Sequence, residues 1–150
     1  MDRPITLSAA EADRPIPEGF APLRRGGPYF LALGALYHRI GTDGGLVIAL
    51  RVTDAHANMI GIAHGGMLAT LADSAMGACV SLMRQTAGES PAMVTVSLTS
   101  EFLSAARVGD WLEAHARVRK PGRRVVFAEC TLRAGGRDVL HASGVFVPAS

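Results

Sequence analysis

The stretch GGMLATLADSAMGACVSLMR, residues 65–84, decides what kind of fold this chain adopts. Its apolar residues recur at steps of three and four positions, which is the period of an α-helix. The residues in this pattern are Leu68, Leu71, Ala72, Ala75, Met76, Cys79, Leu82 and Met83. A helix this apolar is expected to be buried, so the sequence predicts one long helix inside the core.

A narrow stripe of small or polar residues runs along the same predicted helix. Its members are Gly66, Thr70, Asp73, Gly77, Ser81 and Arg84. Because the rest of the helix is apolar, this stripe is expected to face a cavity or a subunit boundary rather than open solvent. A carboxylate in such a helix is costly unless something pairs with it, so Asp73 is either a functional acid or half of a structural ion pair, for example with Arg84.

Extended segments surround the predicted helix. Before it, residues 33–40 and 46–52 flank the turn-rich residues 41–45, which predicts a hairpin. After it the apolar period changes to two, and β-branched residues predict strands over 94–102, 111–120, 125–133 and 139–147. Tight turns separate the last three strands, so their pairing is expected to be antiparallel. This order predicts an α+β fold, with the helix on one face of an antiparallel sheet.

Composition limits the classes of protein to which the chain can belong. Its 150 residues are enough for one domain, and 49% of them are hydrophobic, which suggests that a second copy covers some apolar surface. The net charge of +2 is small and its basic residues are dispersed, which argues against a nucleic-acid partner. The longest charge-free stretch, 55–72, contains two histidines and three glycines and is a poor membrane span.

The first part of the chain differs from the rest. Residues 1–22 are expected to form a loosely ordered arm, with one helical turn near 8–12, and residues 23–150 the folded domain. The arm has no apolar segment after a basic start, so it is not expected to be a secretory signal. Cys79 and Cys130 lie in apolar segments without a CxxC spacing, so reduced thiols and a cytoplasmic location are expected.

The start of the predicted helix carries groups suited to acyl transfer. Gly65 and Gly66 allow a substrate close to the backbone, and the first amide groups of a helix have no intrahelical acceptor. With the helix dipole, these amides suit a carbonyl oxygen that becomes negative, while Asp73 could attack a carbonyl or activate water. Simpler readings stay open, because the glycines could serve packing alone and His64 could be a structural residue.

Asn58, His64-Gly65-Gly66 and Asp73 stand at the spacing found in hotdog-fold acyl-CoA thioesterases of the phenylacetate-degradation (PaaI-like) type. The resemblance continues through 94–98, 102–104, 109–110 and 122–124 and covers about residues 30–147. It implies a hotdog fold, in which an antiparallel sheet wraps around one long central helix. It also implies a homodimer, or a dimer of dimers, that hydrolyses an aryl- or acyl-CoA ester to a carboxylic acid and CoA.

The resemblance also implies roles for individual residues. The Gly65 amide polarises the thioester carbonyl, assisted by Asn58 and His64, while Asp73 acts as nucleophile or general base and Thr95 places the water. The Asn58 and Gly65 side of the site comes from one subunit, and the Asp73 and Thr95 side from its partner. Further expected substrate contacts are Gly66, Gly77, which leaves room for a bulky acyl group, and the basic turn residues Lys120, Arg123 and Arg124 near the CoA phosphates.

Other kinds of chemistry lack their usual motifs. The five histidines include no HxxxH pair and neither cysteine lies near a histidine, so no metal site is expected. No GxSxG elbow or phosphate-binding glycine loop occurs, and no cofactor is expected, since CoA is part of the substrate. Two alternatives remain open: a hotdog enoyl-CoA hydratase or dehydratase, and a non-catalytic acyl-CoA-binding hotdog protein.

Overall fold

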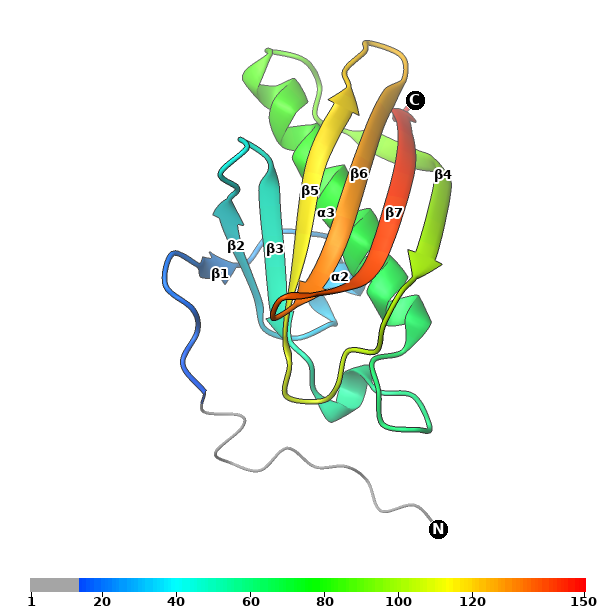
Figure 1. Ribbon diagram of the computed structural model, residues 1–150. Coiled ribbons are helices and arrows are strands. Elements are labelled where there is room, and N and C mark those ends of the chain that lie inside the picture. The colour runs from blue at the N-terminus through cyan, green and yellow to red at the C-terminus, as the bar shows by residue number, and fades with distance from the viewer. Residues whose placement is uncertain (1–13) are drawn as a thin grey trace.

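Seven strands form one sheet against which a long helix lies in the computed structural model of this protein (Figure 1). The structure describes residues 14–150, so the expected helical turn near 8–12 lies outside the described residues. The strands are β1 (Ala21–Leu23), β2 (Leu36–Ile40), β3 (Leu46–Arg51), β4 (Met93–Phe102), β5 (Trp111–Lys120), β6 (Val126–Ala134) and β7 (Arg137–Pro148). The helices are α2 (Pro28–Leu31), the 3-10 turn η1 (Asp54–His56) and α3 (Gly65–Thr86).

The sheet has the order β1-β2-β3-β5-β6-β7-β4, and every neighbouring pair is antiparallel. Figure 1 shows α3 crossing one face of the sheet behind β5, β6 and β7. The strands alternate between buried side chains that face α3 and more exposed ones on the outer face, as in β5 and β6. The predicted α+β arrangement of a long helix on an antiparallel sheet is confirmed.

The apolar side of α3 forms the centre of the core. Leu71, Ala72, Ala75, Met76 and Val80 are fully buried against the sheet. The helix is long and apolar enough to cross a membrane by composition alone, but its buried face identifies it as the core helix of a globular domain. Leu82 departs from the predicted pattern, because its side chain is 43% exposed on the side of α3 that faces away from the sheet.

The first predicted strand begins later than expected. Residues 33–40 were expected to be extended, but β2 starts at Leu36. Residues 28–31 form the short helix α2, with Pro28 in its first turn and Gly34 at φ +100° after its end. A helix of four residues is too short to produce a helical period in the sequence. Residues 21–23 add β1 to the edge of the sheet by pairing with β2.

Both cysteines are free and buried in this core. Burial raises the pKa of the Cys79 thiol and, more strongly, that of Cys130. Neither thiol is therefore suited to act as a nucleophile.

Strand β4 lies at an edge of the sheet and carries several exposed apolar side chains. Val94, Val96, Leu98 and Phe102 are between 39% and 57% exposed. The other long strands bury alternate residues, but β4 buries none of its residues fully. An exposed edge strand of this kind is a template for pairing with another chain.

Arg84 closes the end of α3 and does not belong to a stripe that faces a cavity, as the sequence pattern had suggested. Its side chain is buried, and it forms a 2.8 Å ion pair with Glu89. Its Nε also donates a 2.8 Å hydrogen bond to the Ser90 carbonyl oxygen. These contacts hold the loop between α3 and β4 against the helix, so the role of Arg84 is structural.

We therefore expect Arg84→Met to lower the free energy of unfolding by about 2 kcal/mol, because it removes charge-assisted hydrogen bonds at a buried position. Arg119→Met is the control, since Arg119 is a mostly exposed surface arginine with a 3.6 Å contact to Glu129. It should change the unfolding free energy by no more than about 0.5 kcal/mol. Urea denaturation measures the unfolding free energy of both variants. Equal losses would show that the Arg84 contacts stabilise the fold no more than those of a surface arginine.

Candidate functional site

The first turn of α3 includes the backbone amide of Gly65, which is not used by a neighbouring group in the described part of the chain. His64 is the N-cap, and its Nδ1 accepts a 2.8 Å hydrogen bond from the Gly66 amide. The Gly65 amide has no acceptor among residues 14–150. It therefore stands at the positive end of the helix dipole as a free donor for a ligand oxygen.

The start of α3 is tightly packed at its two glycines, where a side chain would crowd its neighbours. A Cβ atom on Gly65 would lie 3.3 Å from Cε1 of Phe102, and one on Gly66 would lie 3.1 Å from Nδ1 of His64. Gly65 and the Phe102 ring are thus neighbours, which places the start of α3 beside the end of β4.

His64 has a structural role and retains a free donor. Its own amide donates to the His56 carbonyl oxygen at 2.8 Å, and its Nδ1 is used by the cap. In the neutral ring the proton is therefore on Nε2. Because the side chain is exposed, that N–H can reach a ligand next to Gly65. The structural role considered for His64 is thus observed, and it is compatible with the expected catalytic role.

Asn58 holds the loop that precedes His64. Its Oδ1 accepts hydrogen bonds from the amides of Ile60, at 3.1 Å, and Ile62, at 3.3 Å. Gly61 in this loop has φ +79°, a conformation that favours glycine. The side-chain amide group of Asn58 donates no hydrogen bond to residues 14–150. Asn58 therefore shapes the loop through its oxygen and keeps its donors for a ligand.

Asp73 and Thr95 meet farther along α3. The Thr95 hydroxyl donates a 2.7 Å hydrogen bond to Oδ1 of Asp73. A β-bulge between Thr95 and Ser97 in β4 interrupts the pairing with β7 at this point. No ion pair involves Asp73 within residues 14–150, and Arg84, the suggested partner, binds Glu89 instead. The carboxylate is thus oriented by a hydroxyl group and keeps its second oxygen free for water or substrate.

A groove of about 680 Å³ lies over the side of α3 that faces away from the sheet. Asp73, Gly77 and Thr95 line it, and a Cβ atom on Gly77 would lie 3.6 Å from Cε1 of Phe146. The apolar part of its wall consists of Leu23, Phe30, Ile40, Leu46, Ile48, Ala78, Leu82, Pro91, Met93 and Phe146. A half-buried acid in a largely apolar groove has the general form of a small-molecule site.

The two halves of the predicted site do not converge within one chain. Gly65 and Asp73 are eight positions apart on α3, and a helix rises 1.5 Å per residue, so they lie about 12 Å apart along its axis. One carbonyl group cannot contact both. Asp73 therefore cannot act on a carbonyl group that is bound at the Asn58, His64 and Gly65 side of the same chain.

The basic turn lies at the other end of α3. Lys120, Arg123 and Arg124 are exposed, and the Arg123 carbonyl oxygen accepts a 3.4 Å hydrogen bond from Arg84 near the helix end. None of the three lines the groove that contains Asp73. Their expected contact with the CoA phosphates stays a prediction.

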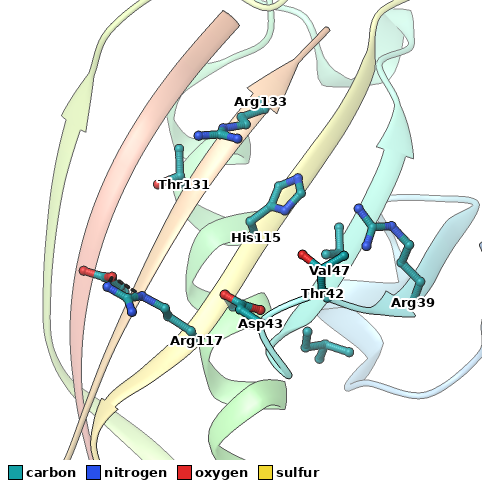
Figure 2. Close-up of a pocket in the computed structure, with 12 residues that line it drawn as sticks. Arg39, Thr42, Asp43, Val47, His115, Arg117, Thr131 and Arg133 are labelled. Carbon is teal, nitrogen blue, oxygen red and sulfur yellow. Dashed lines mark hydrogen bonds and ion pairs between the residues drawn. The ribbon is translucent and has the colours of Figure 1, made fainter. Parts of the chain in front are cut away.

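A second hollow, of about 340 Å³, lies on the outer face of the sheet (Figure 2). Figure 2 shows His115, Thr131 and Arg133 on the strands, with Thr42 and Asp43 on the turn beside them. Several of its charged side chains already have partners, since Arg117 binds Glu129 within the hollow and His115 lies 2.8 Å from Glu113 beside it. It contains none of the expected site residues, so the groove over α3 is the better candidate.

Comparisons with known proteins identify the family of this chain. The family model described as Thioesterase superfamily matches residues 60–141. A protein of Pseudomonas aeruginosa that bears the provisional name of esterase is 47% identical over 131 residues, covering 87% of this chain and 96% of its own.

Two solved structures are similar to this chain as well. A mutant form of the phenylacetic acid degradation protein PaaI of Thermus thermophilus has a TM-score of 0.67 and 28% identity, covering 82% of this chain and 100% of its own. A thioesterase protein of Streptococcus pneumoniae solved with coenzyme A has a TM-score of 0.66 and 25% identity, covering 77% of this chain and 86% of its own.

If His64 caps α3, its replacement should weaken the fold in a specific way. We expect His64→Ala to lower the free energy of unfolding by about 1 kcal/mol, because the Gly66 amide loses its acceptor. His64→Asn keeps a side-chain acceptor at the cap and should restore most of this loss. Urea denaturation of the two variants tests the cap, and equal destabilisation would argue against it.

Proposed function

Because this chain belongs to the thioesterase superfamily, has the hotdog fold and is a thioester hydrolase, we propose that it is an acyl-CoA thioesterase. Water cleaves the bond between the acyl carbon and sulfur, which gives a carboxylic acid and free CoA. The observation that carries this proposal is the 2.7 Å hydrogen bond between Thr95 and Asp73 at the groove. The similarity to a thioesterase solved with coenzyme A supports CoA as the carrier.

The chemistry needs a base and a place for negative charge. Asp73 takes a proton from water while the water oxygen attacks the acyl carbon, and Thr95 holds the carboxylate in position. The carbonyl oxygen becomes negative and accepts a hydrogen bond from the Gly65 amide, with His64 and Asn58 beside it. The tetrahedral species then expels the CoA thiolate. Direct attack by Asp73 on the same carbon, followed by hydrolysis of the anhydride, uses the same groups.

This reaction requires two copies of the chain, and β4 indicates how they pair. Phe102 lies next to Gly65 at one end of β4, and Thr95 contacts Asp73 near the other end. Antiparallel pairing of two β4 strands around a two-fold axis reverses one of them. The Phe102 end of one subunit then lies beside the Thr95 end of its partner. This brings the Gly65 amide of one subunit to the acid of the other, and the homodimer has two equivalent sites.

The exposed apolar surface fits the same pairing. Val96 and Leu98 lie on the β4 edge, and Met59 and Ile60, which are 96% and 77% exposed, lie at the tip of the Asn58 loop. A loop that approaches the groove of a second subunit would cover these side chains. A dimer of dimers is compatible with this arrangement, because the outer face of the sheet stays free.

Further parts of the proposal concern the substrate and its surroundings. Gly66 and Gly77 keep space for the acyl group, and Lys120, Arg123 and Arg124 are proposed to meet the CoA phosphates. The carboxylate and the amide supply both base and oxyanion donor, so the reaction as proposed uses no metal or redox cofactor. Two buried free thiols suit a reducing compartment, so we propose a cytoplasmic location.

The acid is tested by replacement. Asp73→Asn should lower kcat for acyl-CoA hydrolysis by about a thousandfold or more, because it removes the base. Thr95→Val should lower kcat by about tenfold, because Thr95 only orients the base. Free thiol released from phenylacetyl-, benzoyl- and straight-chain acyl-CoA esters measures the rate. Asp138→Asn is the control, since Asp138 pairs with Arg133 on the outer face.

Undiminished activity in Asp73→Asn would remove this residue from the centre of the mechanism. Ester binding without turnover in the wild type would instead favour a binding protein.

The oxyanion donor can be removed without breaking the helix. Gly65 is the first residue of α3, where proline is well tolerated, and His64 before it is extended at φ −62° and ψ 134°. Gly65→Pro removes the N–H group, so we expect kcat to fall by about a hundred- to a thousandfold. Gly65→Ala adds a similar Cβ contact to Phe102 but keeps the amide. Equal losses in both variants would mean that crowding, not the missing donor, explains the effect.

A further inference from the structure

The groove over α3 has two banks of different character. Thr95, Met93 and Pro91 line the β4 side, and residues of β1, β2 and the segment between them line the other. Apart from Asp73 and Thr95, the polar side chains at the groove are Arg25, His38, Ser74, Ser81 and Gln85. The hydroxyl group of Ser81 is already used, since it donates a 2.8 Å hydrogen bond to the Pro91 carbonyl oxygen. The bank remote from the acid thus carries free polar groups.

His38 is an unusual residue for its position. It pairs with Ile48, a core residue that is 1% exposed, so both side chains lie on the face of the sheet that carries α3. Leu36 and Ile40 are the other residues of β2 on that face. A partly buried imidazole on an otherwise apolar strand face lowers stability unless it finds a hydrogen-bond partner.

His38 finds no such partner among residues 14–150, unlike the other four histidines. His56 binds the Leu33 carbonyl oxygen at 2.7 Å, and His64 caps α3. On the outer face, His115 binds Glu113 at 2.8 Å and His141 binds Thr131 at 3.2 Å. The structural explanation that accounts for these four side chains does not account for His38, so a ligand group is the natural partner.

Small side chains leave a path between the acid and this bank. Ser74, Gly77 and Ala78 lie on the surface of α3 between them and line the same groove. A thioester carbonyl at Asp73 would therefore direct its acyl chain across this surface toward β2. Asp73 is the sole carboxylate and Arg25 the sole arginine or lysine among the lining residues that the structure describes. The remote bank is thus cationic and carries hydrogen-bond donors.

We propose that the groove selects acyl-CoA esters whose acyl chain ends in a carboxylate, and that His38 and Arg25 bind this terminal group. The inference rests on the proposed thioesterase function and names its substrate class. A neutral imidazole donates one N–H group, and a guanidinium group can donate two to a carboxylate. A chain that ends in a methyl group would instead cover His38 and leave its polar atoms unpaired.

The test compares esters of equal chain length that differ at the remote end. The pairs are succinyl- and butyryl-CoA, adipoyl- and hexanoyl-CoA, and suberoyl- and octanoyl-CoA, each assayed by release of free thiol. In the wild type, kcat/KM should favour the dicarboxylic ester by about tenfold or more at the chain length that reaches His38. His38→Leu and Arg25→Met should each lower this ratio by about tenfold while leaving the monocarboxylic rate within about twofold.

Two further variants separate recognition from folding. His141→Leu makes the same change on the outer face and should leave the ratio unaltered. His38→Gln keeps a hydrogen-bond donor and should retain part of the preference. Thermal melting and gel filtration confirm that each variant is folded.

Three results would overturn the inference. The first is equal kcat/KM for both members of every pair in the wild type. The second is a preference that His38→Leu and Arg25→Met leave intact, and the third is an equal loss for both esters in these variants. In each case hydrolysis itself continues, so the thioesterase function stands. If the wild type hydrolyses no ester of the panel, the proposed function fails, and this inference fails with it.

Discussion

The separation of Gly65 from Asp73 along α3 is the constraint on which the rest of the account depends. A rigid helix holds an unpaired amide at its start and a hydroxyl-bound carboxylate about 12 Å farther on. The packing of α3 against the sheet fixes both positions, so a loop movement cannot bring them together. Two copies of the chain are the simplest way to place both groups on one carbonyl.

Strand β4 connects this constraint to the fold. It is an edge strand with exposed apolar side chains, it contacts the start of α3 through Phe102, and it orients Asp73 through Thr95. The bulge after Thr95 interrupts its pairing with β7. One strand therefore carries the surface for pairing and contacts both halves of the proposed site. The groove behind it extends across α3 to His38, where we infer that the far end of the substrate lies.

The sequence predicted these features to different degrees. The long helix and most strands were predictable, because their apolar periods are local, and the spacing of Asn58, Gly65 and Asp73 identified the family. Helix α2 has four residues and shows no period. Arg84 was assigned to a polar stripe, because spacing alone cannot distinguish a buried arginine from one that faces a cavity. The alternation of Leu36, His38 and Ile40 could have placed His38 on the inner face, but its lack of a partner depends on distant segments.

The central claim is that each site takes its amide from one subunit and its acid from the other. Co-expression of an Asp73→Asn chain and a Gly65→Pro chain with two different tags allows the mixed dimer to be purified. Each variant alone should be nearly inactive, whereas the mixed dimer has one intact site of two and should show about half the wild-type rate. A mixed dimer as inactive as its parents would contradict the shared site.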